Sequence, residues 1–229
     1  NPGQTVDIAG GVRNEGTIVS LSFDADSTAL RLGDGAIAPT LYNSGSITAG
    51  SSSELDTTNH GIRIDAGATV NTLINTGTIL ASSGGGTADT YAIRDLSGTL
   101  TSITNNRSIQ ATLNANADND PVTGTVVAID VSANTTGVTL VQDGIAATPT
   151  DSNPDTDGDG VPDNNEPNIF GAILLGSGAD TVDIRNGIVV GDISFGDGAD
   201  ELTITGGAVV RGSLSDTDGA LDIDVANGT

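Results

Sequence analysis

Short stretches in which hydrophobic and polar residues alternate recur along the whole chain. Examples are Val6-Asp7-Ile8, Ile62-Arg63-Ile64 and Leu202-Thr203-Ile204. Alternation with a period of two is typical of a β-strand with one buried face. Gly, Asn, Asp and Ser fill the intervals, as turns require, and helical periodicity is almost absent. The pattern predicts an all-β chain of many short strands.

Two sequence elements repeat at a nearly constant distance from each other. In the first, an Asn is followed four positions later by Ile, with copies beginning at Asn14, Asn43, Asn75 and Asn105. The second has copies beginning at Ala29, Gly61, Ala92, Ala128 and Ala172. A repeating unit of about 20 residues with two or three short strands is one coil of a β-solenoid. We therefore expect residues 1–229 to form a single parallel solenoid domain of about seven coils, stacked ~4.8 Å apart.

Stacking places equivalent residues of successive coils above one another. The four Asn side chains are expected to form an amide ladder at one corner. The Gly two positions after each Asn, replaced by Arg107 in the fourth copy, is expected in a left-handed turn conformation. Arg31, Arg63 and Arg94 are expected to form an outward row. That row either contacts an anion or glycan or, as we favour, compensates neighbouring Asp residues.

The repeats differ mainly in insertions, which are expected to share one face of the solenoid. They comprise roughly residues 21–28, 50–60, 82–91, 112–127 and 148–171. Surface loops on a rigid scaffold often carry binding sites, but they also tolerate neutral variation. His60, the one histidine, is at the end of such a loop and is expected to be a surface residue rather than a catalyst.

Composition excludes several classes of function. The chain has 30 acidic and 7 basic residues, a formal charge of −23, so it would repel nucleic acid and anionic membranes. It contains no Cys, which excludes a disulfide framework and a thiol nucleophile. One His excludes a multi-histidine metal site. No apolar run is long enough to span a bilayer as a helix.

The longest insertion, residues 148–171, contains a pattern typical of calcium loops. Residues 155–166 fit D-x-D-x-D-G-x5-E in full. Ca²⁺ takes six to eight hard oxygen ligands, and a tight loop supplies them at this spacing. The predicted ligands are the side chains of Asp155, Asp157, Asp159, Asp163 and Glu166 and the backbone carbonyl of Val161. Pro154 and Pro167 bracket the loop in place of helices, so it is similar to the structural calcium loops of thrombospondin type 3 repeats and dockerins.

A weaker pattern occupies the last coils. Gly176-x-Gly178-x-Asp180 and Gly196-x-Gly198-x-Asp200 are similar to the calcium-binding nonapeptides of RTX toxins. Those nonapeptides recur every nine residues, whereas these copies are 20 residues apart. We therefore interpret Asp180 and Asp200 as turn residues. The alternatives are calcium ligands, as in those nonapeptides, or a pair of hydrolytic carboxylates on adjacent coils.

Taken together, the Asn-x-Gly-[Ser/Thr]-Ile repeats, the Gly-x-Gly-Ala-Asp units and the absence of Cys resemble the passenger region of Gram-negative autotransporters. The resemblance covers nearly the whole chain outside the insertions. It implies a right-handed parallel β-helix that is exported and displayed outside the cell, at the outer membrane surface.

Three functions fit this reading. The preferred one is a non-enzymatic, calcium-stabilised surface module, an adhesin or display stalk that contacts a receptor or glycan. The alternative is a self-assembling filament, sheath or surface layer with calcium-dependent end-to-end or lateral association. A polysaccharide lyase or hydrolase fits less well, because Lys is absent and only two Tyr are present as sugar platforms.

Overall fold

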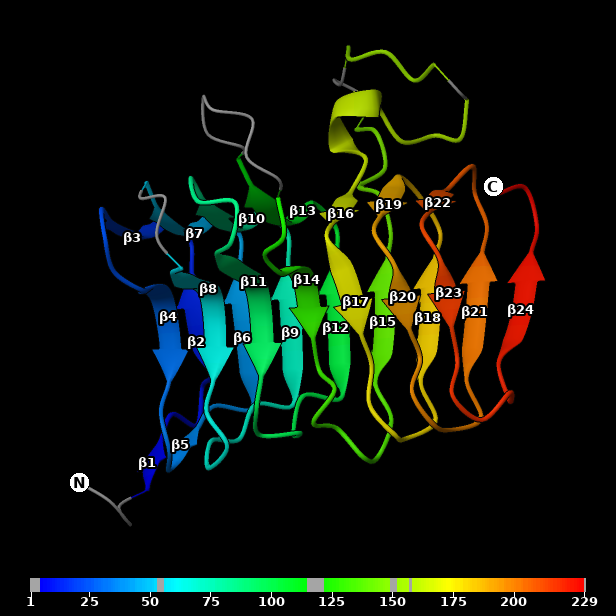
Figure 1. The fold of residues 1–229 in the computed structure, drawn as a ribbon. Coiled ribbons are helices and arrows are strands. Elements are labelled where there is room, and N and C mark those ends of the chain that lie inside the picture. The colour runs from blue at the N-terminus through cyan, green and yellow to red at the C-terminus, as the bar shows by residue number, and fades with distance from the viewer. Residues whose placement is uncertain (1–4, 53–55, 115–121, 149–151, 157, 229) are drawn as a thin grey trace.

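The protein is a right-handed parallel β-helix of seven complete coils and one further strand (Figure 1). The computed structural model describes residues 5–52, 56–114, 122–148, 152–156 and 158–228. Each coil contributes one strand to each of three long sheets, and strands of successive coils pair in parallel. The predicted all-β solenoid of about seven coils is therefore confirmed.

The three sheets are numbered in the order in which each coil visits them. From the N-terminal coil onward, sheet I contains β2 (Val12–Asn14), β6 (Thr40–Asn43), β9 (Thr72–Asn75), β12 (Ser102–Asn105), β15 (Thr139–Gln142), β18 (Thr181–Ile184), β21 (Glu201–Ile204) and β24 (Asp222–Val225). Sheet II contains β3 (Thr17–Ser22), β7 (Ser46–Ser51), β10 (Thr78–Ser83), β13 (Ser108–Leu113), β16 (Asn168–Phe170), β19 (Ile188–Val190) and β22 (Val209–Arg211). Sheet III contains β4 (Ser27–Leu32), β8 (Thr58–Ile64), β11 (Asp89–Asp95), β14 (Val126–Asp130), β17 (Ala172–Leu174), β20 (Ile193–Ser194) and β23 (Leu214–Ser215).

Two short elements lie outside these sheets. Strands β1 (Val6–Asp7) and β5 (Ala36–Ile37) pair with each other beside the first coils. A single turn of 3-10 helix, η1 (Asp163–Asn165), interrupts the longest connection.

Columns of identical or similar aliphatic side chains fill the interior. In sheet II, the register stacks Ile47 on Ile79, Ile79 on Ile109, and Ile109 on Ile169, all fully buried. β-branched side chains suit this arrangement because they pack closely on a pleated surface. The alternation seen in the sequence follows from the same register, since every second residue faces the narrow core.

The amide ladder forms as predicted at the corner between sheets I and II. Each Asn donates from Nδ2 to the next side-chain oxygen, at 2.8 Å from Asn14 to Asn43, 2.8 Å from Asn43 to Asn75 and 2.9 Å from Asn75 to Asn105. Gln142 continues the ladder, accepting from Asn105 at 3.1 Å. The ladder satisfies buried corner groups that water cannot reach.

The glycines beside the ladder are needed for a different reason from the one predicted. The positive-φ glycines do not include Gly16, Gly45 or Gly77, so the expected left-handed conformation was wrong. A Cβ on Gly45 would lie 1.9 Å from the carbonyl oxygen of Gly16, and one on Gly77 would lie 2.1 Å from that of Gly45. Glycine is therefore required at residues 45 and 77 because successive backbones approach each other closely there, whereas a Cβ on Gly16 would meet nothing within 4 Å.

The longest insertion enters the solenoid at a different corner from the other four. Those four connect sheet II to sheet III, as expected, whereas residues 143–167 connect β15 of sheet I to β16 of sheet II. Residues 168–170, expected to belong to the insertion, form β16 because Ile169 pairs with Ile109 in the core. Ile145, in the connection that follows β15, is 41% exposed.

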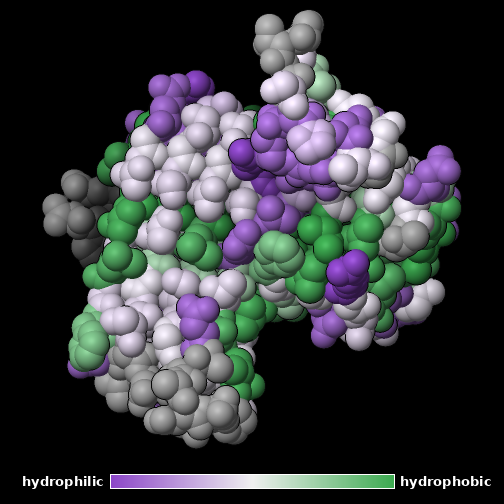
Figure 2. All heavy atoms as spheres, turned by 90° about the horizontal axis from the view of Figure 1, so that it is seen from above, coloured by the Kyte–Doolittle hydropathy of each residue, from purple (hydrophilic) through white to green (hydrophobic). Residues whose placement is uncertain are grey.

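The long connections consequently flank sheet II on both of its edges. In Figure 1 they lie at the top of the molecule, beside sheet II and at the upper ends of the strands of sheets I and III. Seen from above, this side of the molecule shows pale and hydrophobic areas, with hydrophilic side chains gathered over part of it (Figure 2). Sheet II and its flanking connections therefore form one face of the molecule, and this face carries the longest insertion.

Candidate functional site

The acidic loop comprises residues 155–166, in the connection between β15 and β16. Hydrogen bonds from its backbone to its own carboxylates close it. Asp155 accepts from the backbone N–H of Gly158 at 2.7 Å through Oδ1 and from that of Gly160 at 3.0 Å through Oδ2. Asp163 accepts from the N–H of Thr156 at 2.8 Å and donates its own N–H to the carbonyl of Pro154 at 2.9 Å. The structure thus brings the two ends of the predicted calcium loop together.

Asp159 faces the solenoid body. Its Oδ1 accepts from the N–H of Val161 at 2.8 Å, and its Oδ2 accepts from Nδ2 of Asn186. Asn186 follows β18 at the corner between sheets I and II, where its backbone carbonyl accepts from Nε2 of Gln142 at 3.0 Å. A predicted ligand is therefore hydrogen-bonded to a residue that is held by the end of the amide ladder.

The side chain of Val161 fixes the same part of the loop. It is 8% exposed and lies over Gly144, where an added Cβ would be 2.6 Å and 2.7 Å from its two methyl carbons. The same Cβ would lie 3.0 Å from the amide carbon of Asn186. The absence of a side chain at residue 144 makes room for both contacts.

Arg107 fixes the far side of the loop. Its guanidinium donates to the carbonyl of Asn164 and, at 3.3 Å, to Oδ1 of Asn165, both in η1. Arg107 stands at the position of the repeating Gly in the fourth coil, and its side chain makes contacts that glycine could not make. The sequence marked Arg107 as a departure from the repeat, but its partner could be found only in three dimensions.

The oxygen donors of the loop suit a hard cation, although only part of the predicted set is described. Asp155, Asp159 and Asp163 are exposed, and Glu166 is half-buried directly after η1. Asp157 lies outside the described residues. Among the residues that the structure describes, no three acidic or histidine side chains form a metal-sized group. Carboxylate and carbonyl oxygens are the donors that Ca²⁺ prefers. The buried side-chain oxygen of Asn186 has no hydrogen-bond partner and adds another such donor beside the loop.

Asp180 and Asp200 form a buried pair at the corner between sheets III and I. They are 1% and 2% exposed, too enclosed for contact with a polymeric substrate. Asp180 accepts from the N–H of Val138 at 2.6 Å, and Asp200 accepts from the N–H of Asp180 at 2.7 Å, each reaching back one coil. Burial raises the pKa of Asp180 to about 6, assisted by the charge of Asp200. Their interpretation as turn residues matches these backbone bonds.

His60 is buried, contrary to the expectation of a surface residue. It is 3% exposed and stacks on Tyr91 with ring centroids 5.4 Å apart. Burial, followed by the charges of Arg63 and Arg94, lowers its pKa to about 4, so the ring is neutral at pH 7. His60 lies within strand β8 rather than at a loop tip, and its stack with Tyr91 lies beside the arginine row, where the Arg94 guanidinium is 4.2 Å from the Tyr91 ring centroid. The ring contributes packing.

The arginine row is present and paired with Asp residues. The register stacks Arg31 on Arg63 and Arg63 on Arg94. Arg31 and Arg63 both contact Asp65, at 2.6 Å and 2.8 Å, and Arg94 lies 3.2 Å from Asp130. Burial raises the pKa of Asp65, but the hydrogen bonds from Arg31 and Arg63 outweigh it and lower that pKa. Compensation of Asp residues is therefore the role that the geometry supports.

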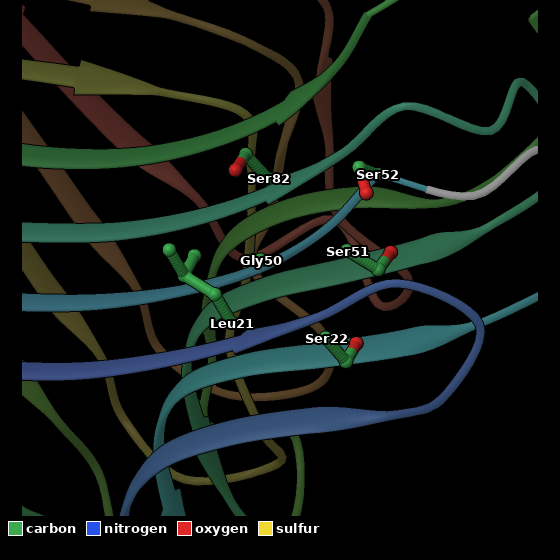
Figure 3. A pocket seen from close by; sticks show the side chains of 6 residues that line it. All are labelled: Leu21, Ser22, Gly50, Ser51, Ser52 and Ser82. Atoms are coloured by element: carbon green, nitrogen blue, oxygen red, sulfur yellow. The ribbon is translucent and has the colours of Figure 1, made fainter.

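A small pocket opens on the outer face of sheet II (Figure 3). It has a volume of about 180 Å³ and is lined by Leu21, Ser22, Gly50, Ser51, Ser52 and Ser82. Leu21, Gly50 and Ser82 are neighbours in one row, and the missing side chain of Gly50 leaves the gap. Hydroxyl groups and one leucine can hold a small polar group but supply no strong acid, base or activated nucleophile.

Comparison with known proteins gives no match for the chain among protein-family models, curated proteins or solved structures. Within the described residues, no helix is sufficiently long and apolar to cross a membrane.

Proposed function

We propose that this chain is a non-enzymatic extracellular surface module, an adhesin or display stalk similar to an autotransporter passenger. The observation that carries the proposal is the arrangement of long connections along both edges of sheet II on a regular scaffold. A scaffold with a closely packed core is rigid, and loops mounted on a rigid element are well placed for recognition.

The chemistry of the described surface supports binding rather than catalysis. The buried carboxylate pair is enclosed, His60 is buried against Tyr91, and the serine-lined pocket lacks a general base among its described residues. A zero-cysteine, strongly acidic chain also suits an exported protein that stays soluble through its charge.

Calcium belongs to the proposal as a structural ion of residues 155–166. Asp155, Asp159, Asp163 and Glu166 would hold it by carboxylate oxygens and Val161 by its carbonyl. Asp157 is the remaining ligand of the sequence pattern. The ion would neutralise the carboxylates that otherwise repel one another on this loop.

The test combines ligand screening with loop replacement. Fluorescently labelled chain should bind cells or a glycan array, and replacing residues 84–88 and 144–166 by Gly-Ser linkers should abolish binding while the β-sheet circular dichroism remains. Unchanged binding after replacement, or release of sugar fragments from the array, would contradict a loop-based adhesin. Light scattering with calcium and then with chelator separates the alternative, because only a self-assembling protein forms large species that need calcium.

A further inference from the structure

We infer that the side-chain oxygen of Asn186, on the sixth coil of the solenoid, is an additional ligand of the cation held by the acidic loop. The ion would then fasten the loop to the end of the amide ladder. This inference rests on the proposed calcium binding by residues 155–166, and it concerns a residue outside that sequence pattern.

The first observation is the environment of the Asn186 amide. The residue is only 3% exposed, and its Oδ1 is buried without a hydrogen-bond partner. Its Nδ2 donates to Oδ2 of Asp159, so the amide group is directed at the acidic loop. A buried carbonyl oxygen that lacks a donor is unfavourable unless a cation or another donor reaches it.

The second observation is that Asn186 is held in place from the solenoid side. Gln142 donates to its backbone carbonyl at 3.0 Å, and the Gly144 backbone leaves space for its amide carbon. Arg107 and Val161 hold the loop against the same corner. The amide and the loop carboxylate therefore face each other from two independently fixed elements.

The chemistry of the amide matches the role. An Asn side-chain oxygen is a hard, neutral donor of the kind that completes calcium sites. Rotation of the amide by half a turn exchanges its N–H₂ and its oxygen, so the group can present either a donor to a carboxylate or an acceptor to a cation. The orientation of the Asn186 amide would therefore depend on whether the ion is bound.

The experiment uses the full chain and two probes, calcium by calorimetry and terbium by luminescence lifetime in H₂O and D₂O. We expect Asn186→Ala to weaken calcium binding by about tenfold and to add one water to bound terbium. Asn186→Asp, which keeps an oxygen at the same place, should retain wild-type hydration and bind calcium at least as tightly. Asn71→Ala, an exposed asparagine in another coil, is the matched control and should match wild type in both measurements.

The outcomes separate the inference from the proposal beneath it. Wild-type hydration of terbium in Asn186→Ala would show that Asn186 only anchors Asp159, and would overturn the inference while leaving the calcium site. Absence of calcium binding to the wild-type chain would overturn both. Thermal unfolding in chelator verifies that each variant is folded before titration.

Discussion

The Nδ2 of Asn43 lies 2.8 Å from Oδ1 of Asn75, although 32 positions separate them in the sequence. Asn75 repeats the contact with Asn105, and its Nδ2 also donates to the carbonyls of Gly77 and Ser108 at 3.1 Å and 3.0 Å. One fully buried side chain therefore joins three successive coils. The ladder is therefore a continuous polar link from the first coil to the fifth.

Replacing Asn75 with Ala should destabilise the protein strongly. The substitution removes the hydrogen bonds that Asn75 makes with the side chains of Asn43 and Asn105 and with corner backbone groups, in a place that water does not reach. We expect a loss on the order of 3 kcal/mol in the free energy of unfolding. Urea denaturation followed by circular dichroism measures it. Asn71→Ala, at an exposed position, should change stability by less than about 0.5 kcal/mol, and equal stability of the two variants would refute a structural ladder.

Glycine beside the ladder should tolerate a methyl group in one coil and reject it in another. The Cβ of Gly77→Ala would meet the Gly45 carbonyl oxygen at 2.1 Å, whereas that of Gly16→Ala would meet nothing within 4 Å. We expect a loss of about 1–3 kcal/mol for Gly77→Ala. Gly16→Ala should be neutral or stabilising by up to about 1 kcal/mol, because Ala restricts the unfolded chain. Similar losses in both would point to backbone conformation as the cause instead of close approach.

The repeat made the fold predictable, because the same spacing recurs in every coil and only stacking explains it. The amide ladder and the arginine row followed from that stacking. The position of the longest insertion did not follow, because the sequence pattern placed residues 168–170 in the insertion, whereas the register of Ile169 with Ile109 makes them a strand. Which segment of a long connection forms a strand depends on which side chain is buried in the core, and a single sequence does not record burial.

The contacts around the acidic loop could not be predicted from the sequence, for a related reason. The spacing of the loop predicts its own ligands, but the contact between Asp159 and Asn186 spans 27 positions and depends on how the loop folds back. The hydrogen bond from Arg107 to the carbonyl of Asn164 spans 57 positions. His60 was assigned to the surface from its place near a loop, whereas stacking on Tyr91 buries it.

Acid should strengthen the last coils of the solenoid through Asp180. Its pKa rises from 3.8 to about 6 on folding, so the folded state favours the neutral carboxyl. The resulting contribution of Asp180 to the free energy of unfolding is fully present below about pH 3.8 and is lost as the pH rises through about 6. The difference corresponds to roughly 3 kcal/mol. Urea unfolding between pH 4 and 7 should show stability falling with pH in the wild type and falling less in Asp180→Asn.

Asp34→Asn is the matched control for that experiment, since it removes one exposed carboxylate with the same change in charge. Its stability should follow the wild-type dependence on pH. If Asp34→Asn flattens the dependence as much as Asp180→Asn does, the effect arises from general charge repulsion rather than from the buried pair.

Docking of the acidic loop should depend on the fit between Gly144 and Val161. Ala at position 144 would place a Cβ 2.6 Å and 2.7 Å from the two Val161 methyl carbons and force the loop away from the corner. We expect Gly144→Ala to raise hydrogen exchange at the N–H of Val161 and its neighbours by at least about tenfold, with little change in the core strands. The double variant Gly144→Ala/Val161→Ala removes the colliding methyl groups and should recover most of the protection. Equal exchange in the single and double variants would show that the loop is held by its polar contacts with Asn186 and Arg107, independently of this packing.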